Sequence, residues 1–311
     1  MNPLVSIIMP SYKRKPLLVE RAINSLVNQS YKNIEIILVD DNAKEEHKQY
    51  RLDLELMVKR LNISFLKYIQ NDKNLGGSLS RNNGIFNSTG EYITFLDDDD
   101  MYETNKIENQ IKYMLDNDLD VCISELAIYN ENDKLVDYRE HNAIESFDND
   151  YLFRYHLTKQ ITGTPTLMYK AHILKQIGGF DDALAGQEFF LMAKTIKANV
   201  KMGYLKQSNI RAYRYDIEAI STGPNKIKGE LVLYKYKKEH FNLLSKKERR
   251  YIRCRHYAVM SVSYRRNKKL IKCLLNLLLA ILIDPILSIK EARGLKKRKK
   301  EFESKWVYMK K

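Results

Sequence analysis

Four consecutive carboxylates follow an apolar stretch in the segment GEYITFLDDDDMY, residues 90–102. The apolar part, residues 92–96, predicts a strand, and the four Asp residues 97–100 come directly after it. Carboxylate oxygens are ligands that Mg²⁺ and Mn²⁺ accept, usually together with the phosphates of a substrate. Because ligands of open α/β sheets bind beyond the carboxyl ends of strands, the segment is a candidate site for a metal-bound nucleotide. An acidic turn that caps a helix beginning near Glu103 would have the same sequence.

The elements that would position this site alternate along the first hundred residues. Predicted strands at 4–9, 34–39 and 63–69 are separated by predicted helices at 17–27, 45–61 and 75–86. This alternation predicts βαβ units and a mostly parallel sheet. Two polar clusters come after the first two strands, and they are Pro10-Ser11-Tyr12 and Asp40-Asp41-Asn42. Parallel strands end at the same edge of a sheet, so one pocket could contain these clusters and the acidic segment.

The pattern beyond residue 102 is less regular. Residues 103–117 and 186–198 have helical spacing, residues 120–128 predict one strand, and residues 130–165 are irregular and rich in aromatic side chains. The aromatic stretch could line a substrate cleft or form an ordinary packed region. The N-terminus has neither a basic region nor a cleavage site, so no signal peptide is expected. The three cysteines are scattered without metal-ligand spacing, as expected of reduced thiols in a cytosolic protein.

The net charge of +14 is unevenly distributed along the 311 residues. Residues 225–311 contain 26 Lys and Arg against 7 Asp and Glu, whereas residues 1–224 contain 27 against 32. This asymmetry predicts a boundary near residues 221–224. We therefore expect a first domain at 1–224 and a basic, mostly helical region at 225–311.

An uncharged apolar run of 11 residues, 273–283, lies between the basic segments 268–272 and 296–300. The run is shorter than the roughly 20 residues that cross a bilayer. A short apolar stripe with basic flanks is typical of a segment that lies on an anionic membrane surface. A helix that faces the core, or one that pairs two chains into a homo-oligomer, would have a similar sequence. No recognised motif supports nucleic-acid binding.

Three segments carry a family resemblance, and they read VSIIMPSYKRKPLLVERAINSLVNQSYKNIEIILVDDNA, SRNNGIFNSTGEYITFLDDDD and IGGFDDALAGQEFFLMAK. Together they resemble glycosyltransferase family 2, inverting enzymes of GT-A fold that include those of bacterial polysaccharide and cell-surface glycan synthesis. The resemblance covers about residues 3–221 and rests on the order and spacing of the segments. It implies an α/β, Rossmann-like fold with a mostly parallel central sheet and flanking helices, here followed by a C-terminal helical extension.

The resemblance assigns nucleotide-binding roles to residues that follow the first two strands. Pro10, Ser11 and Tyr12 match the segment that lies against the nucleoside, and Asp41 matches the residue that accepts a hydrogen bond from uracil. A carboxylate that accepts from a pyrimidine N–H makes a charge-assisted, selective contact. Arg81 matches a basic residue near the nucleotide, although a surface charge on a short helix is an equal interpretation.

The acidic segment matches the family's DxD motif through Asp97 and Asp99. The resemblance implies that Asp99 ligates Mn²⁺ or Mg²⁺ and that Asp97 faces the ribose or the metal. Asp98 between them is a further candidate for donor binding, whereas Asp100 is expected to cap a helix. Asp216 stands where the family often has a His near the metal, and it is a candidate carboxylate ligand.

Inversion at the anomeric carbon requires a base that takes the proton of the acceptor hydroxyl. In the family this base is the Asp of a Glu-Asp pair at the start of a helix, and the matching residues here are Gln187 and Glu188. Glu188 is therefore the candidate base, although a carboxylate that interacts with the helix dipole is the alternative.

These assignments predict a metal-dependent inverting glycosyltransferase at the cytoplasmic face of the cell membrane. The expected donor is a UDP-sugar, and the expected acceptor is a growing surface glycan or a lipid-linked sugar. A sugar nucleotidylyltransferase is disfavoured because its Gly-rich phosphate loop is absent after the first strand. A catalytically degenerate glycan-binding relative would be expected to lose Asp97, Asp99 and Glu188. A basic nucleic-acid-binding protein would leave the acidic cluster unexplained.

Overall fold

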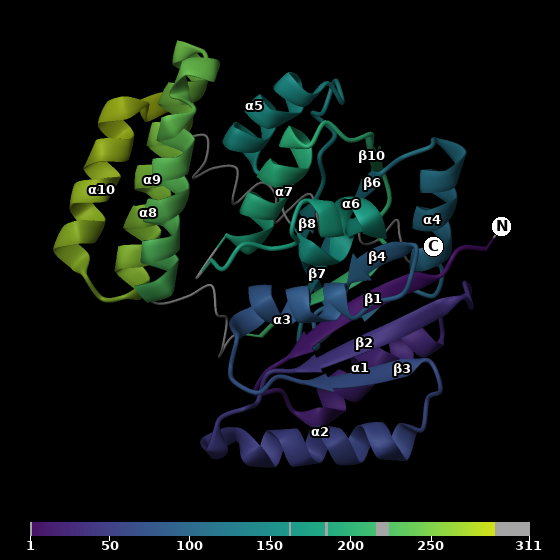
Figure 1. The fold of residues 1–311 in the computed structure, drawn as a ribbon. Coiled ribbons are helices and arrows are strands. Elements are labelled where there is room, and N and C mark those ends of the chain that lie inside the picture. The colour runs from purple at the N-terminus through teal and green to yellow at the C-terminus, as the bar shows by residue number, and fades with distance from the viewer. Residues whose placement is uncertain (1, 162, 184–185, 216–223, 290–311) are drawn as a thin grey trace.

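A computed structural model describes residues 2–161, 163–183, 186–215 and 224–289 of the chain. Within these residues the chain forms a seven-stranded sheet and a four-stranded sheet, with helices around them and a group of helices to one side (Figure 1). The architecture is the expected α/β fold with C-terminal helices.

The larger sheet has the strand order β10-β6-β9-β4-β1-β2-β3. Its strands are β1 (Val5–Ser11), β2 (Ile34–Asp40), β3 (Leu66–Gln70), β4 (Tyr92–Phe95), β6 (Val121–Ser124), β9 (Leu167–Lys170) and β10 (Met202–Leu205). Strand β9 runs antiparallel to both of its neighbours, β4 and β6, and the other neighbouring pairs are parallel. The prediction of a mostly parallel sheet is therefore confirmed.

Helices cover both faces of this sheet. One face is covered by α1 (Pro16–Val27), α2 (Lys48–Leu61) and α4 (Lys106–Asp116), and the other by α3 (Gly76–Phe86), α5 (Asn149–Lys159), α6 (Ala171–Gln176) and α7 (Gln187–Lys197). Side chains of a strand alternate between faces, so Ile7 and Met9 of β1 pack with the first group of helices while Ile8 packs with the second. Both faces are apolar because both are buried.

Strand β1 differs from the prediction at its carboxyl end. The predicted strand ended before Pro10, whereas β1 continues through Pro10 to Ser11 and pairs with β2 along its whole length. The pairing of β1 with β4 stops at Ile8, whose carbonyl accepts a hydrogen bond from Leu96 N. The backbone groups of Pro10 point toward β4, as those of Ile8 do. The pairing with β4 has ended at this position, so the missing N–H of Pro10 leaves no acceptor without a partner.

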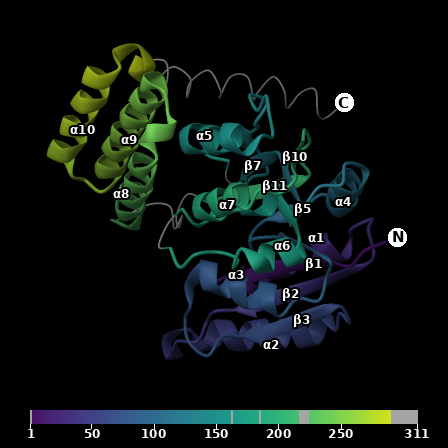
Figure 2. The same cartoon turned by 45° about the horizontal axis from the view of Figure 1, so that its top comes forward.

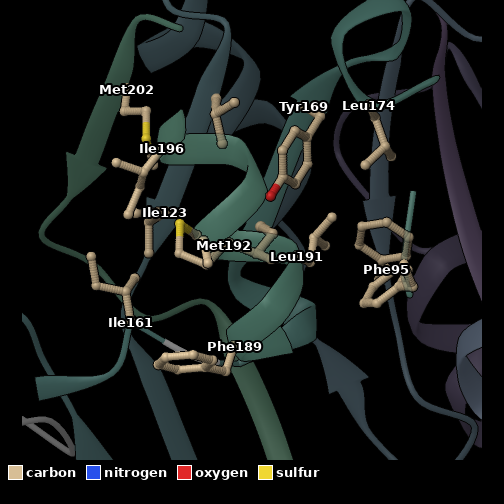
Figure 3. Close-up of a cluster of buried hydrophobic side chains, with 14 of the residues drawn as sticks. Phe95, Ile123, Ile161, Tyr169, Leu174, Phe189, Leu191, Met192, Ile196 and Met202 are labelled. Carbon is tan, nitrogen blue, oxygen red and sulfur yellow. The ribbon is translucent and has the colours of Figure 1, made fainter. Parts of the chain in front are cut away.

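Helix α7 is held against the sheet by an apolar face. Met192 and Ile196 lie beside Ile123 and Met202 of the neighbouring strands β6 and β10 (Figure 3). These side chains are almost fully buried, and burial of each stabilises the fold by roughly 1.5–3 kcal/mol relative to exposure. The packing fixes α7 along its length and so determines where its first residues lie, beginning at Gln187.

The smaller sheet has the order β5-β11-β7-β8. Its strands are β5 (Met101–Tyr102), β7 (Leu126–Asn130), β8 (Leu135–Arg139) and β11 (Ile210–Arg214). The single strand predicted at 120–128 is wrong, because the chain leaves the larger sheet after β6 and enters the smaller one at β7. The residue between them, Glu125, is buried and accepts hydrogen bonds from the hydroxyls of Tyr138 and Tyr204. The irregular stretch 130–165 likewise contains β8 and α5.

The described part of the C-terminal region, residues 224–289, contains the α-helices α8 (Pro224–Glu239), α9 (Lys246–Arg266) and α10 (Leu270–Ile283). The predicted helical character is confirmed, but the chain turns between these helices. Leu233 of α8 and Ile252 of α9 share one core with α5 and α7, whereas α10 lies on the outer side of α9 (Figures 1 and 2). Among the described residues, every helix is too short or too polar to cross a membrane. The domain boundary near residue 224 stays a prediction.

Candidate active site

Residues 97–100, called the acidic turn below, follow β4 and lie at the carboxyl edge of the sheet, beside the end of β1. Ser11 of β1 donates a hydrogen bond of 2.7 Å from Oγ to Oδ2 of Asp98. Arg14 donates from Nε to Oδ1 of Asp98 at 2.9 Å and lies 3.0 Å from Oδ2 of Asp99. The predicted meeting of the Ser11 cluster with the acidic segment is confirmed by these contacts. Arg14 was not predicted, although it stands only three residues beyond the first strand.

Burial of the acidic turn opposes the ionisation of its carboxyls. It raises the pKa of Asp98 to about 7, with Asp99 raising it further and Arg14 opposing the shift. It also raises the pKa of Asp99, where Arg14 again opposes and Asp97 adds to the effect. Arg14 therefore offsets only part of the cost of ionising these carboxyls, and a cation bound at this turn would favour their charged forms further.

Asp100 is buried and holds the smaller sheet rather than a helix. Its Oδ1 accepts a hydrogen bond of 2.8 Å from Tyr213 N of β11, and burial together with the charge of Asp97 raises its pKa well above the usual value. The expectation that Asp100 caps a helix is wrong. Helix α4 begins at Lys106, after Asn105. The alternative reading of the acidic segment as a cap is wrong for the same reason.

Two further arginines contact the turn. Arg81 of α3 is buried and donates from Nη2 to Oδ1 of Asp97 at 2.5 Å, so its interpretation as a surface charge is wrong. Arg21 of α1, which was not predicted, donates to the backbone carbonyl of Asp99 at 2.6 Å and to the hydroxyl of Tyr215 at 3.0 Å. The sequence around Arg21 does not distinguish it from an ordinary surface cation of a helix. Only the fold shows that Arg21 contacts the acidic turn.

Asp41 lies at the end of β2, only 2% exposed, inside a cage of donors. Its Oδ1 accepts from Asn71 Nδ2 and Leu75 N, and its Oδ2 accepts from Asn74 Nδ2 and Gly76 N, each at 2.8 Å. A carboxylate offers about four acceptor positions, so this cage uses all of them. Asp41 therefore fixes the start of α3, the helix that carries Arg81.

Tyr12 follows β1 on the same edge of the sheet. Its ring meets the ring of His47 edge-on, with the centroids 5.4 Å apart, and the ammonium of Lys13 lies 5.3 Å from its centroid. Pro10 precedes it within β1. These residues and Asp41 stand at the ends of adjacent strands, as the sequence predicted.

Glu188 lies in the first turn of α7, after Gly186 in a left-handed conformation with φ of 79°. Its Oε1 accepts a hydrogen bond of 3.2 Å from the hydroxyl of Thr164, a buried residue in the turn before β9. The neighbouring Gln187 accepts a hydrogen bond of 3.1 Å from Nη1 of Arg81. Arg81 thus connects the acidic turn to the first turn of α7. Thr164 was not predicted, because nothing in the sequence places that turn beside α7.

The carboxylate oxygens of the acidic turn are suitable ligands for a divalent cation that also binds phosphate. The described residues contain no group of three His, Cys, Asp or Glu arranged to hold a metal on their own. Mg²⁺ in phosphate-transferring sites is held by one or two carboxylates plus substrate phosphates, and Asp97 and Asp99 supply two hard-oxygen side chains that are 38% and 16% exposed. The third predicted ligand, Asp216, lies outside the described residues.

Comparison with known proteins identifies the class to which this fold and site belong. Residues 6–177 match the sequence family described as "Glycosyl transferase family 2". The match covers more than half of the chain. The chain belongs to glycosyl transferase family 2, and it is a glycosyltransferase.

Two curated relatives illustrate the range of similarity. An uncharacterized glycosyltransferase of Methanocaldococcus jannaschii is 29% identical over 208 residues, which are 66% of this chain and 69% of that protein. WfgD of Escherichia coli, a "UDP-Glc:alpha-D-GlcNAc-diphosphoundecaprenol beta-1,3-glucosyltransferase", is 33% identical over 129 residues, or 42% of this chain and 48% of WfgD. The match spans less than half of WfgD, and only 30% of the GlyA glycosyltransferase of Streptococcus pneumoniae.

Solved structures share the fold at low sequence identity. The crystal structure of residues 1–349 of S. aureus TarS with UDP-GlcNAc aligns with a TM-score of 0.57 at 16% identity, covering 89% of this chain and 91% of that one. The mannosyltransferase PcManGT of Pyrobaculum calidifontis, solved with GDP-Man and Mn²⁺, aligns with a TM-score of 0.58 at 12% identity, covering 99% and 84%. The expected GT-A fold is confirmed.

Proposed function

We propose that this glycosyltransferase is metal-dependent and inverting. In this proposal it moves a sugar from a UDP-sugar to a hydroxyl of a growing surface glycan or a lipid-linked acceptor, at the inner face of the cell membrane. The observation that carries the proposal is the bridge made by Arg81. One guanidinium nitrogen contacts Asp97 of the acidic turn, and the other contacts Gln187, the neighbour of Glu188. Groups suited to the donor phosphates and a candidate base are thereby held in one site.

The acidic turn is the proposed donor-phosphate site. Asp97 and Asp99 would hold Mn²⁺ or Mg²⁺, which when bound supplies a Lewis acid for the charge of the leaving diphosphate. Arg14 and Arg81, which contact these carboxylates, can turn their remaining N–H donors toward phosphate oxygens, a strong charge-assisted contact. Asp98 stays bound to Ser11 and positions Arg14.

Uracil recognition is assigned to Asp41 beside Tyr12. All four acceptor positions of Asp41 are used, so an N–H of uracil would have to replace one donor. Three of the donors are the backbone of the turn or the buried Asn71. Asn74 is only partly buried, and it is the donor that we expect to be replaced.

Glu188 is the proposed base. Its carboxylate accepts the proton of the acceptor hydroxyl while that oxygen bonds to the anomeric carbon. The bond from this carbon to the phosphate oxygen breaks, and the nucleoside diphosphate leaves from the opposite face, so the configuration inverts. Thr164 donates to Oε1 and thereby orients the carboxylate so that Oε2 can take the proton.

The names of relatives support the choice of donor and acceptor. TarS was solved with UDP-GlcNAc and with UDP, and WfgD is named for a UDP-sugar and a lipid diphosphate acceptor. The WcaA relative of Escherichia coli and the TuaG relative of Bacillus subtilis are named for colanic acid and teichuronic acid biosynthesis. PcManGT, however, was solved with GDP-Man, so the nucleotide is the first property to test.

Calorimetric titration with UDP, GDP and CDP, each with and without Mn²⁺, tests the proposal. We expect UDP to bind and its affinity to depend on Mn²⁺. Tighter binding of GDP or CDP would overturn the donor assignment, and equal affinity for UDP without Mn²⁺ would overturn the metal dependence. Absence of binding for all three nucleotides would favour a degenerate relative that binds only glycans.

A further inference from the structure

Helix α10 packs its small side chains inward and its large apolar ones outward. Ala280, 1% exposed, is the buried residue of the helix, and its carbonyl accepts a contact of 3.6 Å from Sγ of Cys254 on α9. About two turns before it, the carbonyl of Cys273 accepts a hydrogen bond of 3.0 Å from the hydroxyl of Ser261 of α9. The α9–α10 interface is therefore made by small and weakly polar groups, as between helices in a membrane.

The opposite side of α10 is a surface of exposed leucine and isoleucine. Nine of these side chains are more than 40% exposed, with Ile271 at 77% and Leu282 at 80%. An ordinary surface helix buries this type of residue and exposes polar ones. A contiguous apolar surface of this size marks a contact with a lipid or a protein.

Cations predominate beside this surface, and Asp284, the acidic residue that follows α10, is paired with Arg250 at 2.9 Å. Residues 265–283 contain no Asp or Glu. The exposed basic residues lie at the end of α9, in the turn between the helices and in the first turn of α10, and they are Arg265, Arg266, Lys268, Lys269 and Lys272. A group of basic side chains next to exposed apolar ones is suited to the headgroups and the upper acyl region of an anionic bilayer.

We propose that the outer face of α10 docks the enzyme on an anionic lipid bilayer, with the helix lying along the surface. The helix is 14 residues long, about 21 Å at 1.5 Å per residue, and so shorter than the hydrocarbon core that a spanning helix must cross. This inference goes beyond the proposed reaction. It concerns a surface that none of the proposed site residues shares, and it holds whichever nucleotide the site binds.

Charge favours the bilayer over the two protein occupants of such a face. A second copy would bring together two regions that each contain 26 basic and 7 acidic residues, and like charges facing each other weaken association. Residues 290–311 of the same chain contain 10 Lys and Arg against 3 Glu, so they would meet the cations of α10 with the same sign. An anionic bilayer has the opposite charge.

Sedimentation of the full chain with lipid vesicles tests the proposal. The vesicles are phosphatidylcholine alone and phosphatidylcholine mixed with phosphatidylglycerol. The variant is Leu274→Glu/Leu282→Glu, and its matched control is Leu52→Glu/Leu56→Glu on α2, where both leucines are also exposed. We expect the wild type and the control to bind the anionic vesicles and the α10 variant to lose about tenfold or more, since binding scales with the apolar area buried.

Two outcomes would overturn the proposal. One is equal binding of the α10 variant and the wild type to anionic vesicles. The other is a lipid-free oligomer, seen by analytical ultracentrifugation, that dissociates in the α10 variant but not in the control, because a second copy would then occupy the face. Circular dichroism of both variants confirms that they are folded. No nucleotide is present, so failure here would remove the proposed membrane location but would leave the proposed reaction standing.

Discussion

Arg81 and Gln187 are 106 residues apart in the chain, and their side chains are joined by a hydrogen bond of 3.1 Å from Nη1 to Oε1. The same guanidinium contacts Asp97 through Nη2. A Cβ on Gly77 would stand 3.1 Å from Nη1 of Arg81, so the absence of a side chain there gives the guanidinium its room. Displacement of Arg81 from Asp97 would therefore also change the position of Gln187 in the first turn of α7.

The first prediction concerns this bridge. Gln187→Ala removes the acceptor for Arg81 and loosens the turn that carries Glu188, so we expect kcat to fall about ten- to hundredfold, the effect of a small misplacement of a reacting group. Gln187→Glu keeps an acceptor for Arg81 and serves as the matched control, with kcat near that of the wild type. Steady-state kinetics measures both variants. Wild-type kcat in Gln187→Ala would show that the bridge has no role in turnover.

The second prediction concerns the base. Glu188→Gln keeps the size of the side chain and its contact with Thr164 but cannot take a proton. We expect kcat to fall by roughly 10²–10⁴-fold while the affinity for nucleotide, measured by calorimetry, stays close to that of the wild type. If kcat is unchanged, another group accepts the proton and Glu188 only stabilises the first turn of the helix.

The third prediction concerns the metal. Asp99→Asn removes a charged oxygen from the turn, and we expect turnover to fall by roughly 10²-fold or more, the range for loss of one group that stabilises a developing charge. Nucleotide affinity should no longer respond to Mn²⁺. The control is Asp118→Asn, which replaces an exposed carboxylate that is paired with Lys201. A variant at position 99 that keeps its Mn²⁺ response would remove Asp99 from the metal site.

The fourth prediction concerns stability against pH. His156 is fully buried, accepts a hydrogen bond from Ile161 N at Nδ1 and donates from Nε2 to Phe189 O, and burial lowers its pKa from 6.5 to about 3. The unfolded chain takes up this proton near pH 6.5 and the folded chain does not. The free energy of unfolding should therefore decrease as the pH falls below 6.5, with His156 contributing about 1.4 kcal/mol per pH unit.

Urea unfolding of the wild type and His156→Gln at about pH 5 and about pH 7 measures this contribution. The variant should be less stable overall, because two buried hydrogen bonds change, but its stability should depend less on pH. Equal pH dependence of the two proteins would show that the pKa of His156 is not lowered in the folded state.

Much of the site could be predicted because its residues follow strands. Ser11, Asp41 and Asp97 each stand just after an apolar run that predicts a strand. Parallel strands bring their carboxyl ends to the same edge of the sheet. The spacing of α7 likewise predicted that Glu188 would stand in a first helical turn. These features depend on local sequence, so periodicity and strand-end position were enough.

The remaining features depend on contacts between distant segments. Nothing in residues 120–128 indicates that the chain changes sheets at Glu125, because the partners of that carboxylate lie 13 and 79 residues further on. The sequences around Arg14 and Thr164 are those of ordinary loops. Only the fold brings Arg14 to the acidic turn and Thr164 to Glu188. The expectation that Asp100 caps a helix fails for the same reason, because the backbone that it binds is that of Tyr213 in the distant strand β11.

The cage around Asp41 has a thermodynamic consequence for donor binding. Its four hydrogen bonds hold residues 71–76 in place, and three of them remain when uracil replaces Asn74 as proposed. A segment that is ordered in advance loses little conformational entropy when a ligand arrives. The nucleoside end of the donor should therefore bind with a small entropy penalty and a heat-capacity change no larger than its own buried apolar surface accounts for.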